Sequence, residues 1–364
     1  MSIHISSRNR DLDVMKKLTE EQRLFIAHRA EASLSNRLRR REKSERRGES
    51  IRKQRIRVHA RAPMTFKSLS GNLRLLQEPA SALRQMNALL DLNKPGKKGQ
   101  RVSVRMDDVV SIDAPSLLLL CSRIQLMSDR YRALVSGTYP KHSAARQALR
   151  EAGFDEFLTG QPQIRVVGRP NVALIQGVLQ NESQVRGEFA NELLAFLQAR
   201  HAALGEEESL FIYLAVMEAI ENIHLHAYGK GETSITHRGW YVVGVYDAEA
   251  KASIVSVLDL GVGIEASARL NPNRFMLSVG DLLRFRSSAD IVELAMTGTR
   301  TETGEAKRGR GLSYLRTFAM EKAGRTLQVI SSGAVVTCTS GGVTKANIPV
   351  CEGTVLTLEI KTLE

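Results

Sequence analysis

The stretch that decides the fold reads Ser253-Ile-Val-Ser-Val-Leu-Asp259-Leu-Gly261-Val-Gly263-Ile264. Its β-branched residues predict a strand that runs into an Asp-x-Gly-x-Gly turn. The glycines would let the backbone approach a flat ligand closely, and a half-buried carboxylate at Asp259 can accept a hydrogen bond from an exocyclic amine such as adenine N6. An ordinary Asp-Gly turn would account for the same residues, so the stretch is informative only together with the segments around it.

Upstream of this strand, the sequence predicts an amphipathic helix over residues 210–227. Glu218 and Asn222 are four residues apart and therefore share one helix face. A carboxylate there can hold an attacking water, and an amide oxygen can bind Mg²⁺, which prefers oxygen ligands. The competing interpretation is that both side chains are simply solvated.

Downstream, Arg308-Gly309-Arg310-Gly311 precedes another predicted helix. Free backbone N–H groups and the positive end of the helix dipole favour a phosphate at such a place. Lys307, Arg308 and Arg310 could clamp the β- and γ-phosphates, or they could be surface charge. A helix N-terminus without a ligand and a nucleic-acid contact of the Arg-Gly type are the other interpretations.

These three segments, followed by Gly353-Thr354 and a predicted strand over residues 354–360, resemble the motifs of the GHKL ATPase family. The resemblance covers about residues 165–364 and implies a Bergerat-type α/β sandwich, with helices over a mixed sheet. It also implies ATP and Mg²⁺ as ligands. The residues that it assigns to the site are Glu218 as general base, Asn222 as Mg²⁺ ligand, Asp259 as adenine acceptor, and Gly261, Gly263, Lys307, Arg308, Gly309, Arg310, Gly311 and Thr354 around the nucleotide.

Within this family the sequence is most similar to the anti-sigma factor serine kinases, because the Glu218–Asn222 motif is followed by His-Ala-Tyr-Gly over residues 226–229. One departure is the segment between Gly263 and Gly309, which the resemblance makes the lid over the phosphates. It is long and contains a predicted helical stretch over residues 290–296. A second departure is the domain that precedes the nucleotide motifs in the same chain.

That preceding domain, predicted over residues 56–163, resembles the STAS domain of anti-sigma factor antagonists. The resemblance rests on the order strand, Ile112-Asp113, apolar helix, second strand and a helix ending at Gly153. In that family the loop after the aspartate carries a serine that a partner kinase phosphorylates. Here Pro115 stands in its place, and Ser116 is expected to be the N-cap of the following helix. The resemblance therefore implies a scaffold or docking domain without the phosphorylation switch.

The net charge of +13 is concentrated near the N-terminus: residues 1–61 contain 18 Lys+Arg and 8 Asp+Glu, whereas the rest of the chain contains 34 and 31. We expect residues 1–55 to form a basic helical arm. Its arginines could attract nucleic acid, since clustered cations release counterions from a polyanion. The arm could instead dock through its few apolar residues on the STAS-like domain or a second subunit, or be a solvated helix.

The composition excludes several classes of protein. The apolar runs are far shorter than the roughly 20 residues of a membrane helix, so no membrane partner is expected. Three cysteines are too few for a disulfide framework, so the cytoplasm is the expected location. The sequence contains no Walker P-loop, which excludes the P-loop class of nucleotide-binding proteins. The prediction is an α/β protein with an arm (1–55), a STAS-like domain (56–163) and an ATP-binding GHKL domain (164–364). It leaves open an ATPase, a serine protein kinase of the anti-sigma type, a non-hydrolysing switch acting with a protein partner or as a homo-oligomer, and a nucleic-acid-binding regulator that acts through the basic arm.

Overall fold

The computed structural model describes residues 64–92, 100–131, 133–154, 172–178, 185–222, 239–270, 287–297 and 311–362. By its contacts the chain divides into two compact units, Met1–Arg61 and Ala62–Glu364, and all described residues belong to the second. The predicted basic arm lies outside the described residues. Among the described helices, none combines the length and the apolar character needed to cross a membrane.

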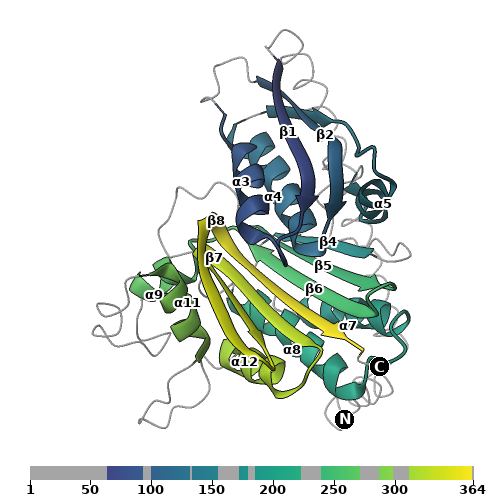
Figure 1. Cartoon of the computed structure of the whole chain (residues 1–364), viewed down its shortest axis with the longest axis vertical. Coiled ribbons are helices and arrows are strands. Elements are labelled where there is room, and N and C mark those ends of the chain that lie inside the picture. The colour runs from purple at the N-terminus through teal and green to yellow at the C-terminus, as the bar shows by residue number, and fades with distance from the viewer. Residues whose placement is uncertain are drawn as a thin grey trace, which may run out of the picture. The chain divides into compact units, whose positions relative to one another are not determined.

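The first part of the second unit is a parallel sheet of three strands in the order β1-β2-β3 (Figure 1). The strands are β1 (Met64–Leu73), β2 (Gln100–Ile112) and β3 (Ala133–Gly137), and the helices are α3 (Pro79–Ala88), α4 (Ala114–Arg130) and α5 (Ser143–Glu151). Each connection between neighbouring strands passes through a helix, as parallel pairing requires. Gly153 has a φ of +71° just after the end of α5, so the predicted helix end is confirmed.

The start of α4 corrects one expectation. The N-cap residue is Asp113, whose Oδ1 accepts a hydrogen bond from the Ser116 N–H at 3.0 Å. Its Oδ2 accepts from the Leu76 N–H at 2.9 Å. Ser116 is therefore not the N-cap: its buried hydroxyl accepts from the Leu75 N–H at 3.0 Å. The carboxylate prevails because it satisfies the helix end and the loop after β1 together.

The second part contains an antiparallel sheet of five strands in the order β4-β5-β6-β8-β7. These strands are β4 (Val172–Val178), β5 (Gly239–Asp247), β6 (Ala252–Asp259), β7 (Arg325–Thr339) and β8 (Gly342–Lys361). With the parallel sheet, this arrangement confirms the predicted α/β class. The expectation of a mixed sheet here is wrong among the described strands, since all four pairings are antiparallel. The reason is that β6 and β7 run in the same direction but are not neighbours, because β8, which forms a hairpin with β7, lies between them.

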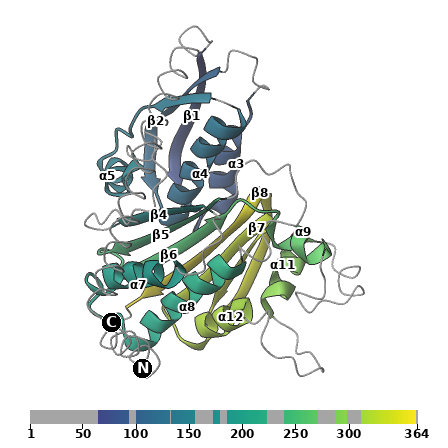
Figure 2. The same cartoon turned by 180° about the vertical axis from the view of Figure 1, so that it is seen from behind.

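Helices cover both faces of the five-stranded sheet (Figures 1 and 2). On one face, Tyr241 and Val243 belong to the apolar core that includes α3 and α4. On the other face, Trp240 and Val242 pack with α7 (Val185–Gln198), α8 (Glu206–Asn222), α11 (Ser288–Thr297) and α12 (Gly311–Glu321). Side chains of a strand alternate between faces. All eight residues of β6 are therefore buried.

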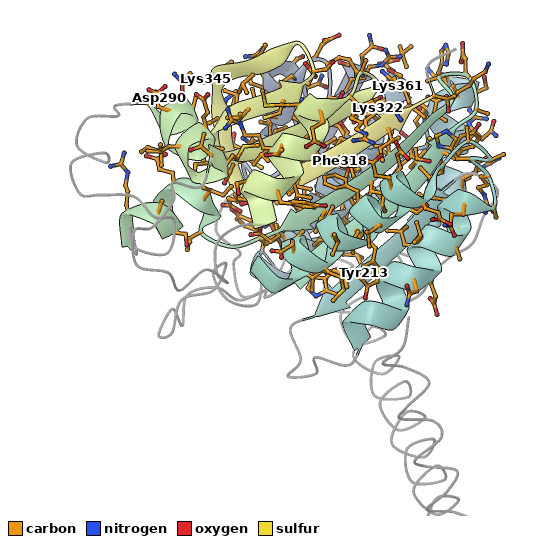
Figure 3. The ribbon with its side chains drawn as sticks, turned by 90° about the horizontal axis from the view of Figure 1, so that it is seen from below. Tyr213, Asp290, Phe318, Lys322, Lys345 and Lys361 are labelled. Atoms are coloured by element: carbon orange, nitrogen blue, oxygen red, sulfur yellow. The ribbon has the colours of Figure 1, made fainter. Side chains whose placement is uncertain are left out.

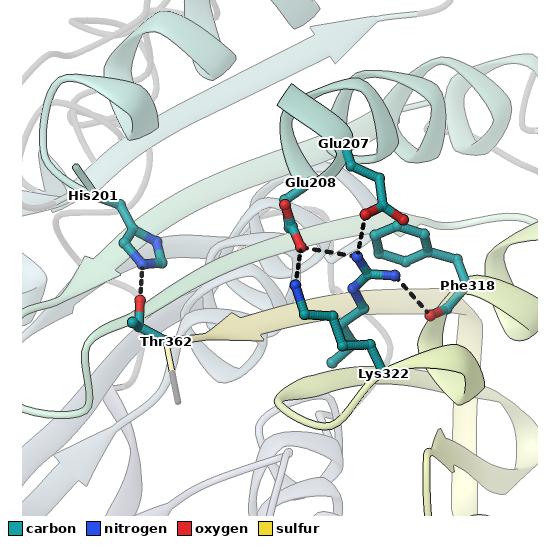
Figure 4. Close-up of polar contacts among 7 residues, drawn as sticks. His201, Glu207, Glu208, Phe318, Lys322 and Thr362 are labelled. Atoms are coloured by element: carbon teal, nitrogen blue, oxygen red, sulfur yellow. Dashed lines mark hydrogen bonds and ion pairs between the residues drawn. The ribbon is translucent and has the colours of Figure 1, made fainter. Parts of the chain in front are cut away.

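At one end of this sheet, the buried Arg325 joins β7 to the start of α8 and to α12. Of its neighbours, Phe318 and Lys322 are labelled in Figures 3 and 4, and Glu207 and Glu208 are labelled in Figure 4. Arg325 Nη2 lies 2.8 Å from Glu208 and 3.0 Å from Glu207. Its guanidinium group stacks 3.6 Å above the Phe318 ring, and Lys322 reaches Glu208 at 3.2 Å. A buried cation is tolerated only when it is paired, and these contacts supply the pairing.

We predict that Asp113→Ala lowers the free energy of unfolding by about 1–2 kcal/mol, because the N–H groups of Ser116 and Leu76 lose their acceptor. Burial raises the pKa of the Asp113 carboxyl, so loss of its charge costs little, and the single oxygen of an asparagine would still accept from one of the two N–H groups. Asp113→Asn should therefore lose less than the alanine variant. Urea unfolding near neutral pH measures both, and equal losses would refute the capping role.

Candidate nucleotide-binding site

Asp259 is the last residue of β6, and its carboxylate is buried with 8% of the residue exposed. Its Oδ1 accepts a hydrogen bond from the Gly261 N–H at 2.7 Å. Burial raises the pKa of Asp259 to about 6, although hydrogen bonds from Gly261 and Thr354 oppose this rise. A carboxylate offers about four acceptor positions, so these contacts leave capacity for a further donor.

The Asp-x-Gly-x-Gly turn meets the Gly353-Thr354 segment at this point. Thr354 is paired with Asp259 in the sheet. Gly353 has a φ of +88°, and a Cβ atom added there would overlap the carbonyl oxygen of Asp259. Gly263 has a φ of +81°, and its Cβ would lie 3.3 Å from the Gly353 carbonyl oxygen. Gly353 is required because two backbones approach too closely for a side chain, and Gly263 because the hydroxyls of Ser331 and Ser332 lie within 3.0 Å of where its Cβ would be.

Ser331 on β7 connects the turn to β8, a role that sequence reasoning missed. Its buried hydroxyl accepts from the Ile264 N–H at 2.8 Å, at the start of α9 (Gly263–Leu270). The same oxygen lies 3.1 Å from Thr354 Oγ1 and 3.3 Å from the Gly353 carbonyl oxygen. The sequence signal that could have indicated this role is Ser-Ser-Gly over residues 331–333, because these turn-forming residues interrupt a run of strand-forming residues.

The β7 strand bends sharply beside the turn. Gln328 Nε2 donates to Thr337 Oγ1 at 3.4 Å, although nine residues of a straight strand would span about 30 Å. The pairing of β7 with β8 is irregular from Ser331 to Ala334, and Ser332 has a φ of +57°. The β7–β8 hairpin therefore folds back where the strands pass Asp259.

A second group of predicted residues meets between α8 and α12. The Glu218 carboxylate lies directly against Gly311, and a Cβ at Gly311 would overlap its Oε2. Gly311 is the first residue of α12, where the helix dipole stabilises negative charge. The helix α8 itself packs on β6 and β8, the strands that carry Asp259 and Thr354.

The remaining predicted site residues cannot be placed as side chains. Asn222 is the last residue of α8, but its side chain lies outside the described residues. Lys307, Arg308, Gly309 and Arg310 lie outside them as well. Within the described ranges, no three His, Cys, Asp or Glu side chains cluster as they would around a metal ion.

The helix α11 corrects the expectation that the whole segment between Gly263 and Gly309 is a lid. Five of its ten residues are buried, and it packs on β7. On the outer side of α11, Lys345 of β8 lies 2.7 Å from Asp290 and 2.6 Å from Glu293. Figure 3 labels Asp290 and Lys345. The apolar residues that predict a helix here also bury it, so α11 belongs to the core.

Comparison with models of known protein families gave no match, and neither did a search of curated proteins. The chemistry of the site therefore rests on its own geometry. It combines a buried acceptor at a strand end, glycines that keep the adjoining backbone bare, and a helix N-terminus beside a carboxylate. These features suit a flat ligand with an exocyclic amine and an anionic tail.

We predict that Gly353→Ala destabilises the protein by about 2–4 kcal/mol more than Gly71→Ala does. Both glycines have positive φ, +88° and +65°, so both variants incur backbone strain. A Cβ at Gly71 has no atom within 4 Å, whereas one at Gly353 overlaps the Asp259 backbone. Chemical denaturation compares the two, and equal losses would contradict the close approach.

Proposed function

We propose that the chain binds an adenine nucleotide with Mg²⁺ in the manner of a GHKL ATP-binding domain. The observation that carries the proposal is the buried Asp259 carboxylate, held by Gly261 and Thr354. Adenine N6 would donate to its free acceptor position. Support comes from Gly263 and Gly353, which leave the turn beside that carboxylate without side chains.

The phosphates belong at the other group of residues. The N-terminus of α12 at Gly311 favours an anion, and Lys307, Arg308 and Arg310 precede it in sequence. Asn222 would hold Mg²⁺ together with phosphate oxygens, and the bound ion would neutralise phosphate charge. The described residues agree with this assignment. Glu218 lies at the N-terminus of α12, and Asn222 follows Glu218 by one turn of α8.

Glu218 is the group that we assign to general-base catalysis. Its carboxylate lies against Gly311, so it would stand beside the phosphates. The same geometry can activate water, giving an ATPase, or a serine hydroxyl of a protein, giving a kinase of the anti-sigma type. A non-hydrolysing switch would use bound nucleotide to dock a partner, and a nucleic-acid regulator would act through the basic residues 1–55.

Asp259→Asn is predicted to abolish adenine-nucleotide binding and to leave the fold intact. Binding is lost because the amide presents a donor to the N6 amine, which is itself a donor. The fold stays intact because the amide oxygen can still accept from Gly261 and because the variant removes a buried charge. In the wild type, adenosine affinity should fall as the pH drops below about 6, because the protonated carboxyl also becomes a donor. Calorimetry at two pH values measures both effects. Wild-type adenosine affinity in the variant would refute the adenine pocket.

Glu218→Gln is predicted to keep ATP affinity within a few-fold while turnover falls by about 100-fold or more, the usual contribution of a general base. The measurement follows the label of γ-labelled ATP. Free phosphate identifies an ATPase, labelled protein identifies a kinase, and neither product in wild-type protein that binds ATP identifies the switch. Unchanged turnover in the variant would remove Glu218 from the catalytic role.

A further inference from the structure

The helix α4, which packs on β3 of the parallel sheet and on β5 and β6 of the five-stranded sheet, carries a wholly buried charged side chain, Arg123. Arg123 is 0% exposed, and it lies in a helix whose neighbouring residues Leu119, Leu120 and Ile124 are buried apolar side chains. A guanidinium group in such surroundings is costly unless it is paired and hydrogen-bonded. Its contacts therefore indicate what it serves.

Those contacts join two helices to one short segment of β8. Arg123 Nη2 donates to Asn87 Oδ1 of α3 at 3.2 Å, and Nη1 lies 3.6 Å from Glu352 Oε2. Asn87 in turn donates to the Val350 carbonyl oxygen at 2.8 Å. Arg123 Nε and Nη1 have no hydrogen-bond partner among the described residues. The pairing with Glu352 is thus electrostatic and incomplete.

The segment that Arg123 holds leads directly into the nucleotide site. Glu352 precedes Gly353 and Thr354, the two residues that adjoin Asp259. Burial raises the pKa of the neighbouring Cys351 thiol to about 11; of the charged groups around it, Arg123 lowers this pKa and Asp259 raises it. Within residues 350–354, Val350 and Glu352 therefore contact Asn87 and Arg123, whereas Gly353 and Thr354 adjoin Asp259.

We propose that Arg123 is a positioning residue, which holds residues 350–354 of β8 so that Asp259 and Thr354 present the geometry that adenine requires. This rests on the proposed adenine-nucleotide function. Arg123 does not belong to the nucleotide motifs, and it acts through Glu352 and Gly353. By linkage, a nucleotide that tightens this segment also stabilises the contacts of Arg123 with α3 and α4. The three-stranded sheet is thereby coupled to nucleotide binding.

The chain offers a matched control for the test. Arg325 is also buried, with 3% exposed, and it is also ion-paired. In the sheet, however, its backbone lies opposite Ile360 of β8 and not opposite the segment beside Asp259. Asp259 is paired with Thr354, six residues earlier in β8, or about 20 Å away along the strand. Arg123→Met and Arg325→Met thus make the same chemical change at the two places.

The experiment measures adenosine and ATP affinity by calorimetry, together with melting temperature, for both variants in the full chain. Arg123→Met should lower both affinities by about 10-fold or more, whereas Arg325→Met should lower the melting temperature and leave affinity unchanged. Glu352→Gln removes a half-exposed partner, so it should fold normally and weaken binding in the same direction. Equal affinity losses in the two methionine variants, or none in Arg123→Met and Glu352→Gln, would overturn the proposal.

Amide hydrogen exchange supplies a readout that does not need the ligand. In nucleotide-free protein, Arg123→Met should accelerate exchange of residues 350–354, and Arg325→Met should not. Addition of ATP to the wild type should slow exchange in α3 and α4, and this effect should vanish in Arg123→Met. If wild-type protein binds no ATP, the proposed function fails, while unaltered exchange of residues 350–354 in Arg123→Met would refute the positioning role by itself.

Discussion

The candidate site depends on the close approach of two backbones, at Gly353 and at Asp259. The two residues lie in neighbouring strands, and no side-chain atom fits between them. Three residues with positive φ, namely Gly263, Ser332 and Gly353, are gathered around this contact. The glycines adopt a positive φ readily, whereas Ser332, with a φ of +57°, costs free energy and persists only where the surrounding packing enforces it. The bend of the β7–β8 hairpin and the start of α9 both lie beside this contact.

Burial of the sheet on both faces explains how a carboxylate can remain in such a place. Helices α3 and α4 exclude water from one face, and α7, α8, α11 and α12 exclude it from the other. With water removed, the ionised form of Asp259 is disfavoured, and its pKa rises to about 6. A carboxyl group poised in this way discriminates strongly between a ligand that donates a hydrogen bond and one that does not. Arg123 belongs to α4, one of the helices that exclude water from the first face, so the acceptor and the cation that we couple to it are buried by the same layer.

Many elements could be predicted from the sequence because their signals are local. The Asp-x-Gly-x-Gly turn does follow a buried strand, Gly311 does begin a helix, and Glu218 does lie on a helix. Other features could not be predicted in this way. The N-cap of α4 is Asp113 rather than Ser116, because the deciding contact comes from Leu76 in another loop. Ser331 lies 67 residues from the backbone amide that it binds.

The sequence by itself determined which residues are candidates for the proposed nucleotide site and predicted many of the strands and helices, since periodicity, glycine and charge act over a few residues. Only the tertiary structure decided the direction of pairing of β6 and β8, the inclusion of α11 in the core, and the position of Arg123 beside Glu352. These depend on which faces are buried together across long separations in the chain. A strand that is buried on both faces has the same apolar run in its sequence whichever elements cover it, so the run does not identify those elements.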